Sequence, residues 1–168
     1  MDAIPAWIRH APILIVAASV ATLGAALVSQ YFFGLLPCVL CLWQRWPYVA
    51  TIVLGALAMP LWPRGALGPW LVALAGLAFL IGGGIAVFHV GVEQHWWQGT
   101  AECGGAPSAR TVEELRAQLI GRPVVRCDEA QFRFLGVSMA GWNVLASAAF
   151  AAFSLAAAKS RLAMRAAR

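Results

Sequence analysis

The spacing of charged residues restricts the fold of this chain more than any other feature. From His10 to Gln44 there is no Asp, Glu, Lys or Arg. A helix needs about 20 apolar residues to cross a bilayer. This run is too long for one span, so it predicts a helix, a break and the beginning of a second helix. Gly34 and Pro37 mark the break, because both residue types interrupt helices. We therefore predict a membrane protein.

The composition agrees with this prediction. The 168 residues are 61% apolar and 11% charged, whereas soluble domains are about 45–50% apolar and about 25% charged. We predict an all-α membrane protein, a four-transmembrane-helix bundle in a single domain over residues 1–168, with spans at about 11–33, 43–61, 67–92 and 139–158. The first span is interpreted as a retained anchor, because it exceeds the ~7–15 apolar residues of a signal peptide and has no clear cleavage site.

The distribution of Lys and Arg predicts the topology. Arg9 precedes the first span, Arg64 lies between the second and third, and four basic residues follow the fourth, namely Lys159, Arg161, Arg165 and Arg168. With four spans these positions share one side, which the positive-inside rule assigns to the cytoplasm. Both termini are then cytoplasmic, and the outer loops at about 34–42 and 93–138 face a compartment where disulfides persist. Topology thus accounts for the net charge of +5, and we predict no nucleic-acid partner.

The long outer loop contains the signals of a short helix. Thr111 and Glu114 form a capping box, and Gly121 suits the far end of a helix. Three apolar residues fall on one face at helical spacing, namely Val112, Leu115 and Leu119. We expect a short amphipathic helix on the membrane surface. A helix packed only against the rest of the loop fits the same pattern.

Four cysteines carry the candidate chemistry, and all lie outside the predicted spans. Cys38 and Cys41 form a C-x-x-C at the beginning of the second span, where a helix terminus lowers the pKa of a thiol. Cys103 and Cys127 lie within the long loop, 24 positions apart. Four cysteines allow three pairings. Structural disulfides and a four-cysteine zinc site are the static alternatives, although zinc sites usually combine two short C-x-x-C hooks.

Arg45 and His89 are the other candidate site residues. Arg45 follows Cys41 by four residues, so the two share a helix face. The guanidinium and the helix N-terminus together favour a thiolate at Cys41, and the cation suits the oxygen of a quinone. The alternative is that Arg45 only extends to the lipid head groups. His89 lies near the outer end of the third span, where it either lines a quinone pocket or bonds a backbone carbonyl.

These residues give the chain a resemblance to the DsbB family of bacterial inner-membrane disulfide bond formation proteins, over nearly its whole length. Residues 36–45, LPCVLCLWQR, are similar to the family's first outer-loop motif, including the arginine at Arg45. Residues 134–139, FLGVSM, are similar to its run into the fourth helix. One departure is Gln44, at a position that is acidic in some members.

The resemblance implies a quinone-dependent oxidoreductase that generates protein disulfides. It implies that a periplasmic thioredoxin-fold oxidase, DsbA, is reoxidised by a Cys103–Cys127 disulfide, and that Cys38 and Cys41 pass the electrons to membrane quinone. It places Arg45 and His89 at the quinone, which is ubiquinone or menaquinone and not covalently bound, and it implies no metal.

Two rivals differ in sequence features. Proteins like vitamin K epoxide reductase also set a C-x-x-C on a four-helix bundle, but late in the chain, whereas here it follows the first span. A non-catalytic membrane protein with structural disulfides or zinc is the alternative from another class.

Overall fold

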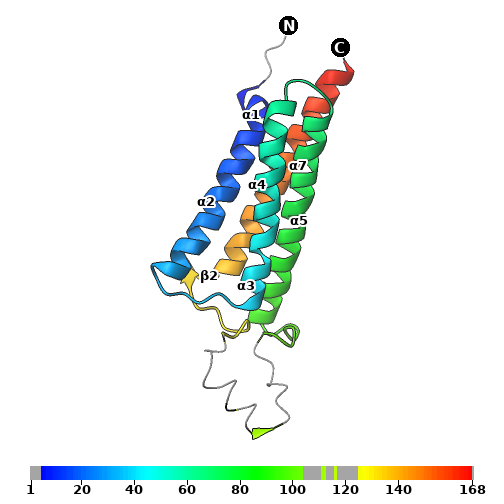
Figure 1. Cartoon of the computed structure of the whole chain (residues 1–168). Coiled ribbons are helices and arrows are strands. Elements are labelled where there is room, and N and C mark those ends of the chain that lie inside the picture. The colour runs from blue at the N-terminus through cyan, green and yellow to red at the C-terminus, as the bar shows by residue number, and fades with distance from the viewer. Residues whose placement is uncertain (1–4, 104–110, 113–115, 117–124, 168) are drawn as a thin grey trace.

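In the computed structural model, long helices pack side by side as a bundle (Figure 1). The structure describes residues 5–103, 111–112, 116 and 125–167. The elements in this part of the chain are α1 (Ala6–Arg9), α2 (Ala11–Tyr31), α3 (Val39–Trp43), α4 (Arg45–Leu61), α5 (Leu67–Glu93), β1 (Arg133–Phe134), β2 (Val137–Ser138) and α7 (Met139–Ala166). Helix α1 and the end of α7 lie at one end of the bundle, and α3 lies at the other end.

Three of the described helices are long and apolar enough to cross a membrane, namely α2, α5 and α7. They coincide with three of the predicted spans. Helix α4 has 17 residues and Pro60 inside it, and it is not among the three. The fourth span therefore stays a prediction, although α4 packs within the same bundle.

Helix α7 extends beyond the predicted span of 139–158, to Ala166. The charged residues after position 158 end the apolar run but not the helix, because Ala, Lys and Arg all favour helical backbone. Arg161 adds a tertiary contact there, since its guanidinium carbon lies 6.0 Å from the centre of the Trp62 ring. Trp62 in turn donates from Nε1 to Ile8 O, 2.9 Å away, which ties α1 to the same end of the bundle.

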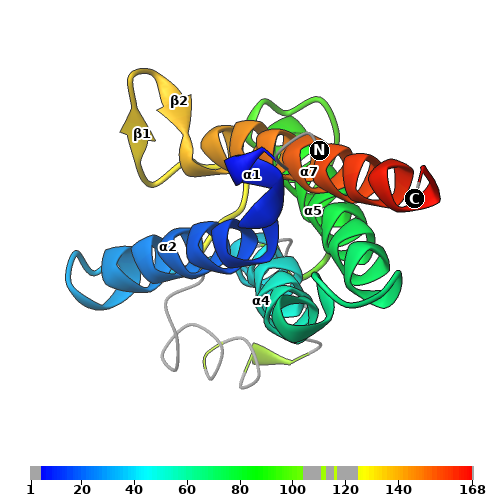
Figure 2. The same ribbon diagram turned by 90° about the horizontal axis from the view of Figure 1, so that it is seen from above.

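The core lies where α4, α5 and α7 meet. Phe79 of α5 is 1% exposed, and its ring lies between Tyr48 of α4 and Phe150 of α7, at centroid distances of 5.8 and 5.3 Å. Helix α2 is tied to α4 by a buried hydrogen bond between Ser19 Oγ and Thr51 Oγ1, 2.7 Å long. From above, α2 and the β1–β2 hairpin extend away from α5 (Figure 2).

A small β-hairpin precedes α7, and the all-α prediction did not include this hairpin. Its strands pair antiparallel, with Arg133 opposite Ser138 and Phe134 opposite Val137. Leu135 and Gly136 form the turn with positive φ angles of 52° and 79°, the backbone that two-residue hairpins require. The predicted amphipathic helix falls mainly on residues 113–115 and 117–124, which lie outside the described part of the chain.

Candidate active site

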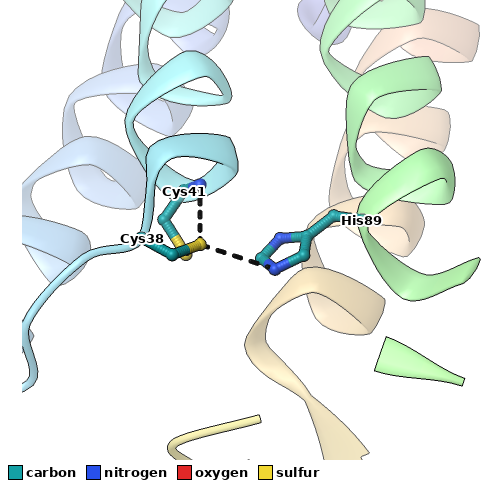
Figure 3. A group of neighbouring side chains, drawn as sticks. All are labelled: Cys38, Cys41 and His89. Carbon is teal, nitrogen blue, oxygen red and sulfur yellow. Dashed lines mark hydrogen bonds between the residues drawn. The ribbon is translucent and has the colours of Figure 1, made fainter. Parts of the chain in front are cut away.

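Cys38 and Cys41 lie together at the beginning of α3. Cys38 is the N-cap residue, and its Sγ accepts a hydrogen bond from the backbone N–H of Cys41, 3.3 Å away. The two sulfur atoms are 3.1 Å apart and both cysteines are free. His89 of α5 points at the same place, with its Nε2 3.6 Å from Cys38 Sγ (Figure 3). The C-x-x-C is thus a dithiol with a histidine beside its first sulfur.

The two thiols differ strongly in acidity. The pKa of Cys38 is lowered from its ordinary 9.0 to about 4, chiefly because the Cys41 thiol donates to it; burial opposes this effect, and His89 adds to it. The pKa of Cys41 is raised, because it hydrogen-bonds that thiolate and is itself buried. We expected the thiolate at Cys41. In this dithiol it lies at Cys38, which accepts from the Cys41 thiol and also from the backbone N–H of Cys41 in the first turn of α3.

The pairing that the sequence left open is resolved by the structure. Cys103 and Cys127 form a disulfide, with their Cα atoms 5.0 Å apart. They lie in one buried cluster with Cys38, Leu40 and Val92, and Cys41 packs against this cluster. A four-cysteine zinc site does not fit, because two of its ligands are bonded to each other. All four cysteines therefore gather at one end of the bundle as a dithiol beside a disulfide.

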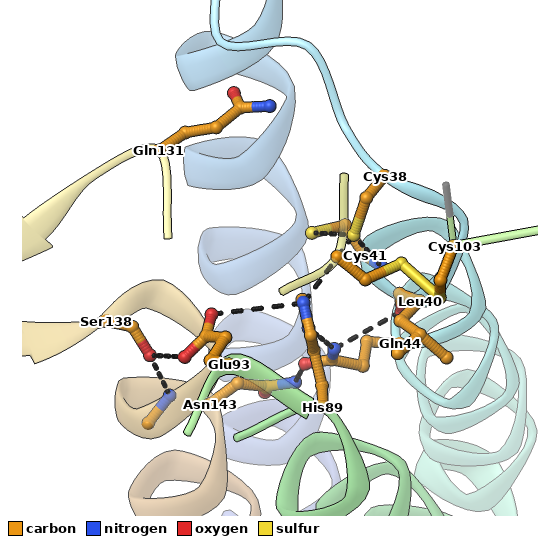
Figure 4. A network of polar contacts seen from close by, with 12 residues as sticks. Cys38, Leu40, Cys41, Gln44, His89, Glu93, Cys103, Gln131, Ser138 and Asn143 are labelled. Atoms are coloured by element: carbon orange, nitrogen blue, oxygen red, sulfur yellow. Dashed lines mark hydrogen bonds and ion pairs between the residues drawn. A yellow bond between two sulfur atoms is a disulfide. The ribbon is translucent and has the colours of Figure 1, made fainter. Parts of the chain in front are cut away.

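A buried polar network surrounds His89 (Figure 4). Gln44 Nε2 lies 2.8 Å from His89 Nδ1, and Asn143 Nδ2 donates to Gln44 Oε1. Glu93, one turn after His89, places Oε1 3.9 Å from His89 Nε2, and its other oxygen accepts from Ser138 Oγ. Glu93 is not among the site residues predicted from the sequence, because the predicted outer loop begins at this residue. Its spacing of four residues from His89 was the available signal.

Arg45 does not contact Cys41 by any hydrogen bond found in the described residues. Its Nη1 donates to Gln30 Oε1 of α2, 2.7 Å away, and no acidic side chain pairs with it among the described residues. Arg45 nevertheless lines the same cavity as Cys41 and His89. The guanidinium is thus half-buried at the cavity wall, held by an amide rather than neutralised by a carboxylate.

That cavity has a volume of about 440 Å³ and is walled mostly by apolar side chains. Its apolar lining includes Leu23, Ala26, Leu36, Tyr48, Met139 and Trp142. Its polar lining includes Cys38, Cys41, Gln44, Arg45 and His89. An apolar cavity with a few convergent polar groups is typical of sites for small organic molecules. Near this wall, ligand atoms of Cys38, Cys41 and His89 also lie within 4.8 Å of one another, close enough for a metal ion.

Together the fold and the site define a class: a membrane protein of the thiol–disulfide redox type, with a reactive dithiol beside a disulfide. The chain belongs to the DsbB family, since the family model described as "Disulfide bond formation protein DsbB" matches residues 8–157. It is therefore a disulfide-generating oxidoreductase of the membrane.

Named relatives agree with this membership. Disulfide bond formation protein B of Neisseria gonorrhoeae is 32% identical over 143 residues, which cover 80% of this chain and 85% of the relative. The protein of the same name from Chromohalobacter salexigens is 32% identical over 129 residues, or 73% of this chain and 74% of the relative. No solved structure matches the chain.

Proposed function

We propose that this protein is an inner-membrane thiol:quinone oxidoreductase that reoxidises a DsbA-like periplasmic thioredoxin-fold protein. Electrons pass from that partner through Cys103–Cys127 and Cys38–Cys41 to ubiquinone or menaquinone. The observation that carries the proposal is the placement of a disulfide and an acidic dithiol in one buried cluster at the wall of an apolar cavity. Both termini lie in the cytoplasm and the four cysteines face the periplasm, in line with the positions of the basic residues.

The residues of the cavity fit a quinone. A bound quinone supplies an acceptor for two electrons and two protons. The cavity volume of about 440 Å³ falls in the range of about 300–1,000 Å³ that small-molecule sites occupy. Its apolar wall suits the ring, and Arg45 presents donors that suit a carbonyl oxygen. Because no carboxylate among the described residues neutralises Arg45, its charge is available to the ligand.

The first exchange takes place at Cys103. A thiolate of the reduced partner attacks Cys103 Sγ, the Cys103–Cys127 bond breaks, and Cys127 leaves as a thiolate. Cys103 is 7% exposed and Cys127 is 0% exposed, so the attacked sulfur is the more accessible of the two. The partner's second thiolate then displaces Cys103, which completes the partner's own disulfide.

The second exchange joins the two outer loops. Cys127 attacks Cys38 of an oxidised Cys38–Cys41 pair, and Cys41 leaves as a thiolate. Return of Cys103 to Cys127 restores their disulfide and leaves Cys38 and Cys41 as the reduced pair, so two electrons and two protons have moved from the partner to the C-x-x-C. While Cys38 is bonded to Cys127, it is not a thiolate that accepts a hydrogen bond from the Cys41 thiol. The chief cause that raises the Cys41 pKa is then absent.

The test is an assay with purified full-length protein, a reduced thioredoxin-fold partner and either ubiquinone or menaquinone, followed by quinone absorbance. We expect turnover with the wild type. The Cys41→Ser variant should lose quinone reduction but still trap the partner at Cys103. Quinone reduction at the wild-type rate by Cys41→Ser would overturn the electron path.

Arg45→Ala tests the quinone site separately. We expect a higher apparent KM for quinone with thiol exchange retained, because the donor to the quinone oxygen is lost. Arg64→Ala is the matched control, since Arg64 is exposed and its Nη1 donates to Pro60 O, four residues earlier in the chain. An unchanged quinone titration in Arg45→Ala would assign this side chain to the lipid head groups instead.

A further inference from the structure

The side-chain amide of Gln44 has an orientation that a backbone carbonyl determines. Gln44 is 6% exposed, and its Nε2 lies 3.2 Å from Leu40 O. A carbonyl only accepts hydrogen bonds, so the atom that faces Leu40 must be the amide nitrogen. At its other end, Gln44 Oε1 accepts from Asn143 Nδ2. Reversing the amide would set oxygen against the Leu40 oxygen and nitrogen against the Asn143 nitrogen.

Asn143 is oriented in the same way. Its Oδ1 accepts from the hydroxyl of Tyr48 and from Ser147 Oγ, 3.3 Å away. Because Gln44 presents its Oε1 to Asn143, the atom of Asn143 that faces it must be the donor Nδ2. The two hydroxyls are compatible with this arrangement, so the Leu40 carbonyl determines the orientation of the Gln44 amide, and that orientation directs an N–H at His89.

The orientation of Gln44 sets the hydrogen of the His89 ring. Gln44 Nε2 and His89 Nδ1 are 2.8 Å apart. An amide nitrogen has no lone pair to offer, so His89 Nδ1 must be the acceptor. A hydrogen on Nδ1 would point directly at the hydrogen of Gln44. A neutral imidazole carries a single hydrogen, and here it must lie on Nε2.

The groups on the Nε2 side fit a donor. Cys38 Sγ lies 3.6 Å from Nε2, and Glu93 Oε1 lies 3.9 Å from it. Thiolate and carboxylate are both acceptors. We propose that Gln44 is a positioning residue that holds His89 neutral with its hydrogen on Nε2, so that His89 donates to the Cys38 sulfur and does not ligate a metal ion.

The same hydrogen bonds explain why His89 does not ligate a metal ion. A histidine that binds a metal through one nitrogen donates its other N–H to an acceptor. His89 would have to bind through Nε2, which faces the sulfur atoms, and donate from Nδ1. Its partner there is the N–H of Gln44, which is itself a donor. Gln44 therefore withholds the third ligand from an ion at Cys38 and Cys41, and the dithiol stays available for exchange.

The first experiment measures the ring directly. The inference rests on the cysteine pair of the proposed function, so the full-length Cys103→Ala, Cys127→Ala chain is reduced to isolate Cys38 and Cys41. Histidine labelled with ¹⁵N is incorporated, and His89→Gln assigns the signals. We expect His89 with a protonated Nε2 and a bare Nδ1. A protonated Nδ1 would overturn the proposal without any variant at Gln44.

The second experiment uses Cd²⁺ as the probe, in the same reduced chain, with thiolate–cadmium absorbance as the readout. Gln44→Glu replaces the donor by an acceptor, so we expect Cd²⁺ to bind about 10- to 100-fold more tightly, the size of effect that outer partners of a ligating histidine produce. Gln94→Glu adds the same charge at an exposed position one residue beyond α5 and should leave the affinity unchanged.

If the reduced chain with Gln44 and the same chain with Gln44→Glu bind Cd²⁺ with equal affinity, the role of Gln44 in excluding a metal is overturned. Neither experiment contains a quinone or a protein partner. Their failure would therefore leave the proposed electron path standing, whereas a failure of the quinone assay would leave the assignment of His89 standing.

Discussion

The acidity of Cys38 gives the sharpest quantitative prediction. Its pKa is lowered from 9.0 to about 4 in the dithiol. Only the thiolate reacts with an alkylating reagent, so the rate should follow the ionised fraction. Between about pH 6 and 8 an ordinary thiol goes from about 0.1% to about 10% ionised, whereas a thiol of pKa about 4 is fully ionised throughout.

Absolute rates do not separate these cases, but the pH dependence does. The nucleophilicity of a thiolate falls with its pKa, with a Brønsted slope of about 0.4–0.5, so a shift of five units weakens it about 100- to 300-fold. Burial of Cys38 slows the reagent further. Both factors are independent of pH. The folded rate should therefore be constant within about twofold from pH 6 to 8, while the rate in the unfolded chain rises about 100-fold.

The assay is iodoacetamide labelling of the reduced Cys103→Ala, Cys127→Ala chain, with the modified cysteine located by peptide mass. Peptide mapping separates Cys38 from Cys41, and the denatured chain gives the reference profile. His89→Gln should raise the apparent pKa of Cys38, because His89 lowers it. A folded Cys38 rate that rises tenfold or more across this pH range would refute the reasoning.

Three further predictions concern stability, each measured by thermal or denaturant unfolding in detergent. Gly91→Ala should cost about 1–3 kcal/mol, because the new Cβ would overlap the Trp97 ring and break its 2.9 Å bond to Phe88 O; Gly84→Ala, on the same helix with open space around it, should be neutral or slightly stabilising. Ser19→Ala and Thr51→Ala should each lower stability, and a double-mutant cycle should give a coupling of about 0.6 kcal/mol, the average for polar contacts in a membrane; no coupling would mean that the 2.7 Å contact contributes nothing. The reduced protein should gain stability relative to the oxidised protein as pH rises from about 4 to 9. The pKa of Cys38 is lower in the folded chain than in the unfolded chain, so its ionisation stabilises the fold fully above the unfolded pKa, and this stabilisation is lost as pH falls through the folded pKa. A stability difference that does not vary with pH would contradict this.

Much of the bundle was predictable because a bilayer imposes a simple rule on sequence. Apolar runs of about 20 residues predict spans, and α2, α5 and α7 fall on three such runs. The hairpin before α7 was not predictable in the same way, since its strands have only two residues each. The turn at Leu135 and Gly136 was its only local signal.

The candidate site was predictable where spacing along the chain encodes proximity. The C-x-x-C places two sulfur atoms together by itself. The contacts of His89 depend instead on how α5 packs against α3, which no short motif encodes. Gln44 shows the same limit: the sequence marks it only as a departure from the family pattern, whereas its partners His89 of α5 and Asn143 of α7 lie 45 and 99 positions away along the chain.

The cavity wall has a consequence for steady-state kinetics. Among the described residues that line it, Cys38 and Cys41 are present and Cys103 and Cys127 are absent. Under the proposed function, an acceptor in the cavity meets only the second pair, and the partner meets only the first. The partner and the acceptor then react in separate binding events, and the enzyme stays in its reduced form between them. Such a scheme gives parallel lines in double-reciprocal plots when the second substrate is varied.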